Sequence, residues 1–181
     1  MSRTTPGQGA PDANDDNERN AGWRALVEHL GLQPHPEGGY YRETYRSGKQ
    51  VPGRNGLRSA ATSIYYLLAD GACSAWHRID ADETWYFHAG GPLALHVLSP
   101  DGSLTTHMLG NPLEEADTVL QATVPAGCWF AAELAHQDGF ALMGCAVAPG
   151  FEFGGFELAR AGDMQGAAHR HGAWVRRLLK A

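Results

Sequence analysis

Hydrophobic residues follow two different spacings along the chain. The first apolar residues recur with the period of a helix, at Trp23, Leu26, Val27 and Leu30. Asn20 before them is a suitable N-cap, and Gly31 after them is a suitable C-terminal stop. The pattern therefore predicts a short amphipathic helix of about three turns.

After that helix, as far as Leu158, short runs rich in Val, Tyr, Trp, Phe and Thr alternate with Gly, Pro, Asp and Asn. The runs cover residues 40–46, 60–68, 72–79, 83–88, 93–98, 103–108, 117–124, 128–134, 139–147 and 155–158. Between them, Pro100-Asp101-Gly102 and Pro125-Ala126-Gly127 are typical of tight turns. Many short strands at nearly regular spacing predict an all-β fold, either an antiparallel sandwich or a barrel.

The two ends differ from this central part. Residues 1–19 contain little that a core could bury, so we expect a disordered tail there. Residues 20–158 form the single predicted domain, and residues 159–181 form a C-terminal extension. Within the extension, Trp174, Val175, Leu178 and Leu179 suggest a short helix, and both a docked helix and a frayed end fit the pattern.

Composition and charge narrow the class of protein. The chain has 181 residues, 43% of them hydrophobic, and a formal net charge of −6. The chain has 20 Asp and Glu against 14 Lys and Arg, which does not suggest a basic surface that binds a polyanion. We therefore expect no nucleic-acid partner. No apolar run is long enough to span a bilayer, so we expect no membrane association. Cys73, Cys128 and Cys145 form no CxxC pair and predict reduced core thiols in a cytoplasmic protein.

Candidate chemistry lies where two predicted strands meet. Side chains two residues apart share one face of a strand, so His77 points the same way as Ile79, and Glu83 the same way as Trp85. If residues 80–82 form the connecting turn, His77 and Glu83 converge inside the barrel. An imidazole beside a carboxylate among aromatic rings suits proton transfer. The same pair also fits a purely structural hydrogen-bonded unit, or a Glu83 that points to water.

The segment from Pro36 to Tyr45 is a second candidate. Its two glycines allow a close approach of the backbone, and Tyr41 and Arg42 follow them. In one interpretation both residues line the mouth of a pocket, where Arg42 binds a carboxylate or phosphate of the ligand. In the other, Arg42 pairs with Glu43 or another acid at the surface. Glu37 has weaker support than either.

These residues carry a family resemblance. Gly71, His77, Glu83 and Gly90 have the spacing of the first conserved motif of the cupin superfamily, with Ile79 in place of its second histidine. Residues 125–130 resemble the second cupin motif, with Phe130 in place of its histidine. More narrowly, the segments at residues 36–45, 76–85 and 147–153 together resemble the fifth cupin family of domain classifications.

The resemblance implies a cupin double-stranded β-helix, an RmlC-like jelly-roll barrel, with a pocket at its mouth. It also implies a homodimer. The cupin superfamily includes isomerases, epimerases, oxygenases and plain binding proteins, so the fold alone names no reaction.

Three functions fit such a pocket. We favour a small-molecule pocket with metal-independent, isomerase-like or epimerase-like chemistry on a sugar or related metabolite. His77 is then the base, oriented by Glu83, and a tyrosine is the acid. The candidate tyrosines are Tyr41, Tyr65 and Tyr86, and the candidate walls are Trp85, Phe130 and Phe151.

Two alternatives stay open. A non-catalytic binding module needs only the aromatic walls and a few polar groups. A metal-dependent cupin oxygenase would need a divalent ion held by His77 and Glu83, which is a weak donor set because Ile79 and Phe130 are apolar. We expect no cofactor, and we expect His88 and His96 to be surface histidines.

Overall fold

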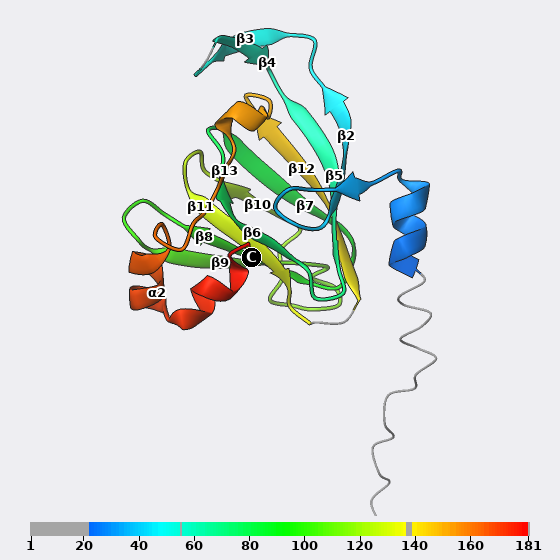
Figure 1. The fold of residues 1–181 in the computed structure, drawn as a ribbon. Helices are drawn as coiled ribbons and strands as arrows, with labels where there is room; N and C mark the ends of the chain where they lie inside the picture. The colour runs from blue at the N-terminus through cyan, green and yellow to red at the C-terminus, as the bar shows by residue number, and fades with distance from the viewer. Residues whose placement is uncertain (1–21, 55, 137–138, 181) are drawn as a thin grey trace, which may run out of the picture.

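Two curved antiparallel sheets form a barrel, as Figure 1 shows for the computed structural model. The structure describes residues 22–54, 56–136 and 139–180. The tail expected at residues 1–19 lies outside these residues. No helix in the described part of the chain is long and apolar enough to cross a membrane.

The larger sheet has six strands, in the order β1 (Gln33–Pro34), β2 (Tyr40–Arg46), β5 (Thr62–Ala69), β12 (Phe140–Ala148), β7 (Asp82–Gly90) and β10 (Gln121–Val124). The smaller sheet has five strands, in the order β13 (Glu157–Leu158), β6 (Cys73–Arg78), β11 (Trp129–Leu134), β8 (Leu93–Leu98) and β9 (Leu104–Leu109). The prediction of an all-β barrel is confirmed. Two predicted runs, 40–46 and 93–98, match β2 and β8 at both ends.

A hairpin that the pattern did not predict projects from one end of the barrel (Figure 1). It consists of β3 (Gln50–Gly53) and β4 (Gly56–Ser59). Pro52 and Gly53 are unfavourable in a strand such as β3. Proline has no backbone N–H to donate to a neighbouring strand, and glycine loses more conformational entropy on folding than other residues. A second difference lies at residues 155–158, where a 3₁₀ turn, η1 (Phe153–Gly155), precedes the short strand β13.

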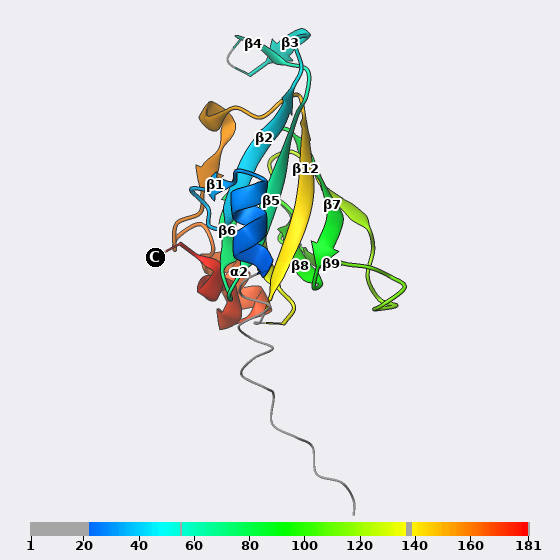
Figure 2. The same ribbon diagram turned by 90° about the vertical axis from the view of Figure 1, so that its right-hand side faces the viewer.

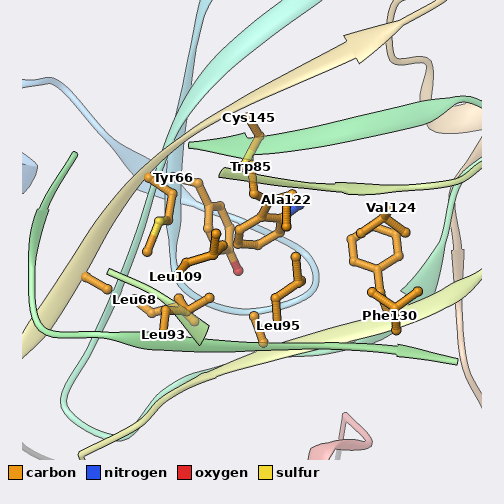
Figure 3. Packing of buried hydrophobic residues seen from close by; sticks show 14 of the residues in the cluster. Tyr66, Leu68, Trp85, Leu93, Leu95, Leu109, Ala122, Val124, Phe130 and Cys145 are labelled. Carbon is orange, nitrogen blue, oxygen red and sulfur yellow. The ribbon is translucent and has the colours of Figure 1, made fainter. Parts of the chain in front are cut away.

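The core lies between the two sheets. Figure 3 shows Leu93 and Leu95 of β8 packed beneath Tyr66 and Trp85 of the larger sheet. Phe130 of β11 lies at one side of the same cluster. These residues come from the inward-facing positions of their strands, as the alternation of side chains requires.

Two further layers cover the outer faces of the barrel. The N-terminal helix, residues 22–29, lies across the larger sheet, where its Trp23 packs near Leu67 and Leu142 (Figure 2). On the smaller sheet lie α2 (Gln165–His171) and the 3₁₀ helix η2 (Ala173–Leu178). The Trp76 indole N–H of β6 donates a 2.8 Å hydrogen bond to the Val175 carbonyl. Of the two possibilities left open for the C-terminal residues, the structure shows the docked helix.

This outer layer corrects the expectation for His96. The residue points outward from β8, yet only 7% of it is exposed, because the C-terminal layer covers it. The centroid of its ring lies 4.9 Å from that of Trp174. Its Nδ1 atom is hydrogen-bonded to the Thr106 hydroxyl, and its Nε2 atom to the Glu133 carboxylate. His88, in contrast, is exposed as expected.

Candidate functional site

A cavity of about 170 Å³ opens into the barrel between the sheets. Its walls are mainly aromatic and aliphatic. They also carry six buried or half-buried side chains that can exchange a proton: His35, Glu37, Tyr66, His77, Glu83 and Cys145. Such a concentration of ionisable groups away from water is typical of a functional site.

The turn before β2 carries Glu37 into the cavity. A Cβ atom on Gly38 would lie 2.2 Å from the Cys73 carbonyl oxygen, so only glycine allows this close approach to β6. The backbone of Glu37 is fixed there as well, since its carbonyl accepts a 2.9 Å hydrogen bond from the Ala75 N–H. The glycines of this segment therefore place the Glu37 side chain against β6.

Glu37 and His77 form a buried pair. The Nε2 atom of His77 lies 3.1 Å from Oε2 of Glu37, and the Ser74 hydroxyl donates a 2.8 Å hydrogen bond to Oε1. Nδ1 of His77 lies 2.7 Å from the Ala75 carbonyl, which can only accept, so Nδ1 carries the proton. Burial lowers the pKa of His77 to about 4 and raises the pKa of Glu37. The pair is therefore neutral as a whole, and one proton is shared between Oε2 and Nε2.

His35 completes this cluster on the side of the mouth. Its Nδ1 atom lies 3.4 Å from Oε2 of Glu37 and accepts a hydrogen bond from the Glu37 backbone N–H. Burial lowers the pKa of the imidazole, so it is neutral at pH 7. Its ring meets that of Tyr41 edge-on, with centroids 4.5 Å apart.

Glu83 is a second buried proton carrier that lines the same cavity. Burial, and then the nearby charge of Glu37, raises its pKa to about 8, so the carboxyl is mostly protonated at neutral pH. The Cys145 thiol is hydrogen-bonded to it, and burial raises the pKa of that thiol, which keeps the sulfur protonated and unreactive.

Trp85 presents an unused donor in this wall. Its indole N–H is buried and has no hydrogen-bond partner, and no other buried side-chain nitrogen or oxygen of the described residues shares that state. A buried donor without an acceptor is costly in a folded protein. The indole lines the cavity, and its nitrogen has almost no surface accessible to water.

The structure brings together five of the residues singled out in the sequence. His77, Glu83, Tyr41, Trp85 and Phe151 all line the cavity. The carboxylate against the His77 ring is that of Glu37, however, whereas we expected Glu83 to orient it.

The other four candidates lie elsewhere. Phe130 lies behind His77, with ring centroids 3.9 Å apart, and does not line the cavity. Arg42, Tyr65 and Tyr86 are also absent from its lining, because each is one residue away from an inward-facing neighbour and so points to the other face of its sheet. The guanidinium of Arg42 lies 6.0 Å from the Tyr65 ring on that face.

Several cavity residues were not assigned a role from the sequence, among them His35, Tyr66 and Arg46. Glu37 was noticed and given little weight. The sequence signal for Glu37 was the pair Gly38-Gly39, which indicates that the backbone there passes close to another segment. The pair does not show which segment that is.

An ion-pair network fixes the mouth of the cavity. Arg46 makes two hydrogen bonds to Glu43, at 2.9 and 2.8 Å, and one of 3.0 Å to Glu152. It also donates to the Phe151 carbonyl. These contacts tie β2 to the segment after β12 that covers the cavity.

A second network anchors the start of that segment. The Arg58 guanidinium pairs with Asp80 at 2.9 Å and donates to the carbonyls of Pro149 and Gly150 at 2.8 and 2.7 Å. Arg58 is buried and Asp80 is partly buried, and these bonds join the projecting hairpin to the barrel.

The donor set does not fit a cupin-type metal centre. Two positions that would carry imidazoles in the cupin motifs hold the buried apolar residues Ile79 and Phe130. In residues 22–54, 56–136 and 139–180, no group of three or more His, Cys, Asp or Glu side chains is arranged to hold a metal ion. The Oε2 atom of Glu37 instead lies at hydrogen-bond distance from Nδ1 of His35 and Nε2 of His77. These three side chains are therefore arranged for hydrogen bonding and not for metal binding.

The similarity to known proteins covers the strands of both sheets. The sequence model of the family described as cupin superfamily (DUF985) matches residues 24–159. The crystal structure of a protein from Shewanella oneidensis is 42% identical, with a TM-score of 0.78 over 86% of this chain and 96% of its own. A hypothetical protein from Leishmania major is 34% identical, with a TM-score of 0.78 over 87% and 98% of the two chains. An uncharacterised protein of Saccharomyces cerevisiae is 30% identical over 143 residues, which are 71% of this chain and 70% of the yeast protein.

Proposed function

This chain belongs to the DUF985 family of the cupin superfamily, and from that premise we propose that it binds a small molecule in the barrel cavity and moves a proton on it without a metal ion. The observation that carries the proposal is the presence of two buried proton carriers in one aromatic cavity. One is the Glu37–His77 pair, and the other is Glu83.

The two carriers suit opposite halves of a proton transfer. Glu83, with a pKa of about 8, is close to the pH at which a carboxyl both takes and gives a proton efficiently. Its ionised form removes a proton from a carbon next to a carbonyl group, and the C–H electron pair becomes the double bond of an enol. The Glu37–His77 pair donates its shared proton to the carbonyl oxygen. Return of a proton to the opposite face of that carbon, with loss of the enol proton, completes an epimerisation. If the carbon carries a hydroxyl group, protonation of the former carbonyl carbon with loss of that hydroxyl proton completes an isomerisation.

Trp85 supports the same arrangement. Its indole ring lines the cavity as an apolar wall against the bound molecule. The cavity is large enough for a small ring or a short chain, and its aromatic walls suit the apolar face of a sugar.

The experiment is deuterium wash-in, which needs no known product. The protein is incubated in D2O and EDTA with a panel of small sugars and hydroxycarbonyl compounds, and loss of C–H signals is followed by proton NMR. We expect exchange on at least one compound, and we expect Glu83→Gln and Glu37→Gln each to slow it by about 100-fold or more.

Glu157→Gln is the matched control, because this exposed carboxyl pairs with Arg78 and does not line the cavity. A compound that binds in the cavity without exchange by the wild-type protein would contradict the catalytic step and favour the binding module. Exchange that requires an added metal ion would contradict the metal-free step.

The homodimer and the cytoplasmic location remain predictions. Light scattering at micromolar concentration tests the first, and a monomer mass would contradict it.

A further inference from the structure

The charges around the cavity are unbalanced. Four carboxyl groups line it. Glu37 belongs to the neutral pair with His77, and Glu83 is mostly protonated. That leaves the carboxylates of Glu43 and Glu152, which pair with Arg46. Among the described residues, Arg46 is the only arginine or lysine in the lining. The two lining imidazoles add no positive charge, since burial lowers the pKa of both His35 and His77.

Arg46 is already fully engaged. It makes a bidentate contact with Glu43 and a further hydrogen bond to Glu152, so one positive charge faces two carboxylates. Among the residues that line the cavity, the charged groups at the mouth are therefore two carboxylates and one guanidinium. An anionic ligand would have to displace one of these carboxylates to reach the guanidinium.

Two other cations near the cavity are also held by protein groups. The Lys180 ammonium donates to the Pro36 carbonyl, outside the lining. The guanidinium of Arg58 is shared between Asp80 and two carbonyls. Both are held outside the lining, although the charge of Lys180 still acts on His35 and Glu37.

Aromatic rings form the rim at the same place. The ring of Phe153 is 54% exposed, although large apolar side chains are usually covered, and it stacks over His35 with centroids 6.5 Å apart. Phe151 meets Phe153 edge-on at 5.0 Å, and Tyr41 meets the His35 ring edge-on at 4.5 Å. Exposed π faces beside carboxylates form the environment that recognises an organic cation.

We propose that the cavity takes a small organic cation, with its ammonium group at the rim between the Phe153 ring and the carboxylate of Glu152, and the rest of the molecule inside. The inference rests on one part of the proposed function, namely that a small molecule occupies the cavity. It adds the charge of that molecule and the residues that select it.

Three probes of nearly the same shape test the inference, namely benzylamine, benzyl alcohol and benzoate. Ligand-observed NMR with the full chain gives their dissociation constants. We expect benzylamine to bind about tenfold more tightly than benzyl alcohol, and benzoate to bind most weakly. Glu152→Gln and Phe153→Leu should each reduce the preference for benzylamine about threefold.

Glu114→Gln is the matched control, because this exposed carboxyl bonds Asn111 and lies outside the cavity lining. Benzoate binding as tightly as benzylamine would overturn the inference. So would the failure of all three probes to bind, or an unchanged preference in both rim variants. The deuterium exchange assay decides the proposed proton transfer separately, since neither Glu152 nor Phe153 is one of its proton carriers.

Discussion

The Nε2 atom of His77 lies 3.1 Å from Oε2 of Glu37, in a part of the barrel where both side chains are almost fully buried. The two residues are 40 positions apart, and a glycine-dependent turn brings them together. A buried pair of this kind needs all its hydrogen bonds, because neither partner can turn to water.

Removal of the Glu37 side chain should therefore destabilise the fold. In Glu37→Ala, the Ser74 hydroxyl and Nε2 of His77 lose their partner in a buried site, and we expect a loss of about 3 kcal/mol in the free energy of unfolding. Glu37→Gln keeps the size and one acceptor, and should cost less than half as much. Urea unfolding followed by circular dichroism measures both, and equal stability of Glu37→Ala and wild type would refute the prediction.

Glu83 and His77 should give stability opposite dependences on pH. Burial raises the pKa of Glu83 from 4.5 to about 8, so the folded state keeps a proton that the unfolded chain releases. Stability then falls as the pH rises through that interval, by up to about 1.4 kcal/mol per pH unit. Burial lowers the pKa of His77 from 6.5 to about 4, so stability falls as the pH drops from 6.5 toward 4. The two effects oppose each other between pH 4.5 and 6.5.

Urea unfolding at a series of pH values separates the two groups. Wild type should lose stability between pH 6.5 and 8, and Glu83→Gln should reduce that slope. Some slope should remain, because burial also raises the pKa of Glu37. His77→Gln should keep the slope above pH 6.5 and reduce the decline on the acid side. Part of that decline should remain, because burial also lowers the pKa of His35 and His96. Identical slopes for Glu83→Gln and wild type would show that Glu83 is ionised in the folded protein.

Arg58 should be far more important for stability than its neighbour Arg54. Arg58→Ala leaves Asp80 and the carbonyls of Pro149 and Gly150 without their buried donor, and we expect a loss of about 3 to 5 kcal/mol. Arg54→Ala, at an exposed position, should change stability by less than about 0.5 kcal/mol. Thermal unfolding of the two variants compares them, and similar midpoints would count against the proposed anchor.

The C-terminal layer should contribute to the stability of the barrel. Leu178 is 1% exposed against the smaller sheet, so Leu178→Ala should cost about 2 to 4 kcal/mol through the cavity it leaves. Leu113 is 93% exposed, so Leu113→Ala is the matched control and should be nearly neutral. If Leu178→Ala unfolded at the same denaturant concentration as wild type, the layer would be only loosely attached.

Strand alternation was the most informative signal in the sequence. It placed β2 and β8 at their observed bounds, and it put His77, Glu83 and Trp85 inside the barrel. The same rule explains where the site prediction was incomplete. Tyr41 and Arg42 are adjacent, so only one of them can face the cavity, and the structure shows that it is Tyr41.

Contacts between distant segments could not be predicted in the same way. The burial of His96 depends on residues near Trp174, which cover it from the far end of the chain. The pairing of Glu37 with His77 depends on the close approach of Gly38 to Cys73, and no local pattern shows which strand such a turn will meet. Local sequence sets the period of each strand, whereas tertiary packing selects its partners.

The contact between the Lys180 ammonium and the Pro36 carbonyl has a practical consequence. It places the last described residue of the chain beside the turn that delivers Glu37. An amine-reactive label on Lys180 would break this contact and place its bulk next to the turn, where it can disturb the proton carriers. The helix of residues 22–29 lies on the outer face of the larger sheet instead (Figure 2), so an exposed position on that helix is the better attachment point for immobilising the protein in ligand screens.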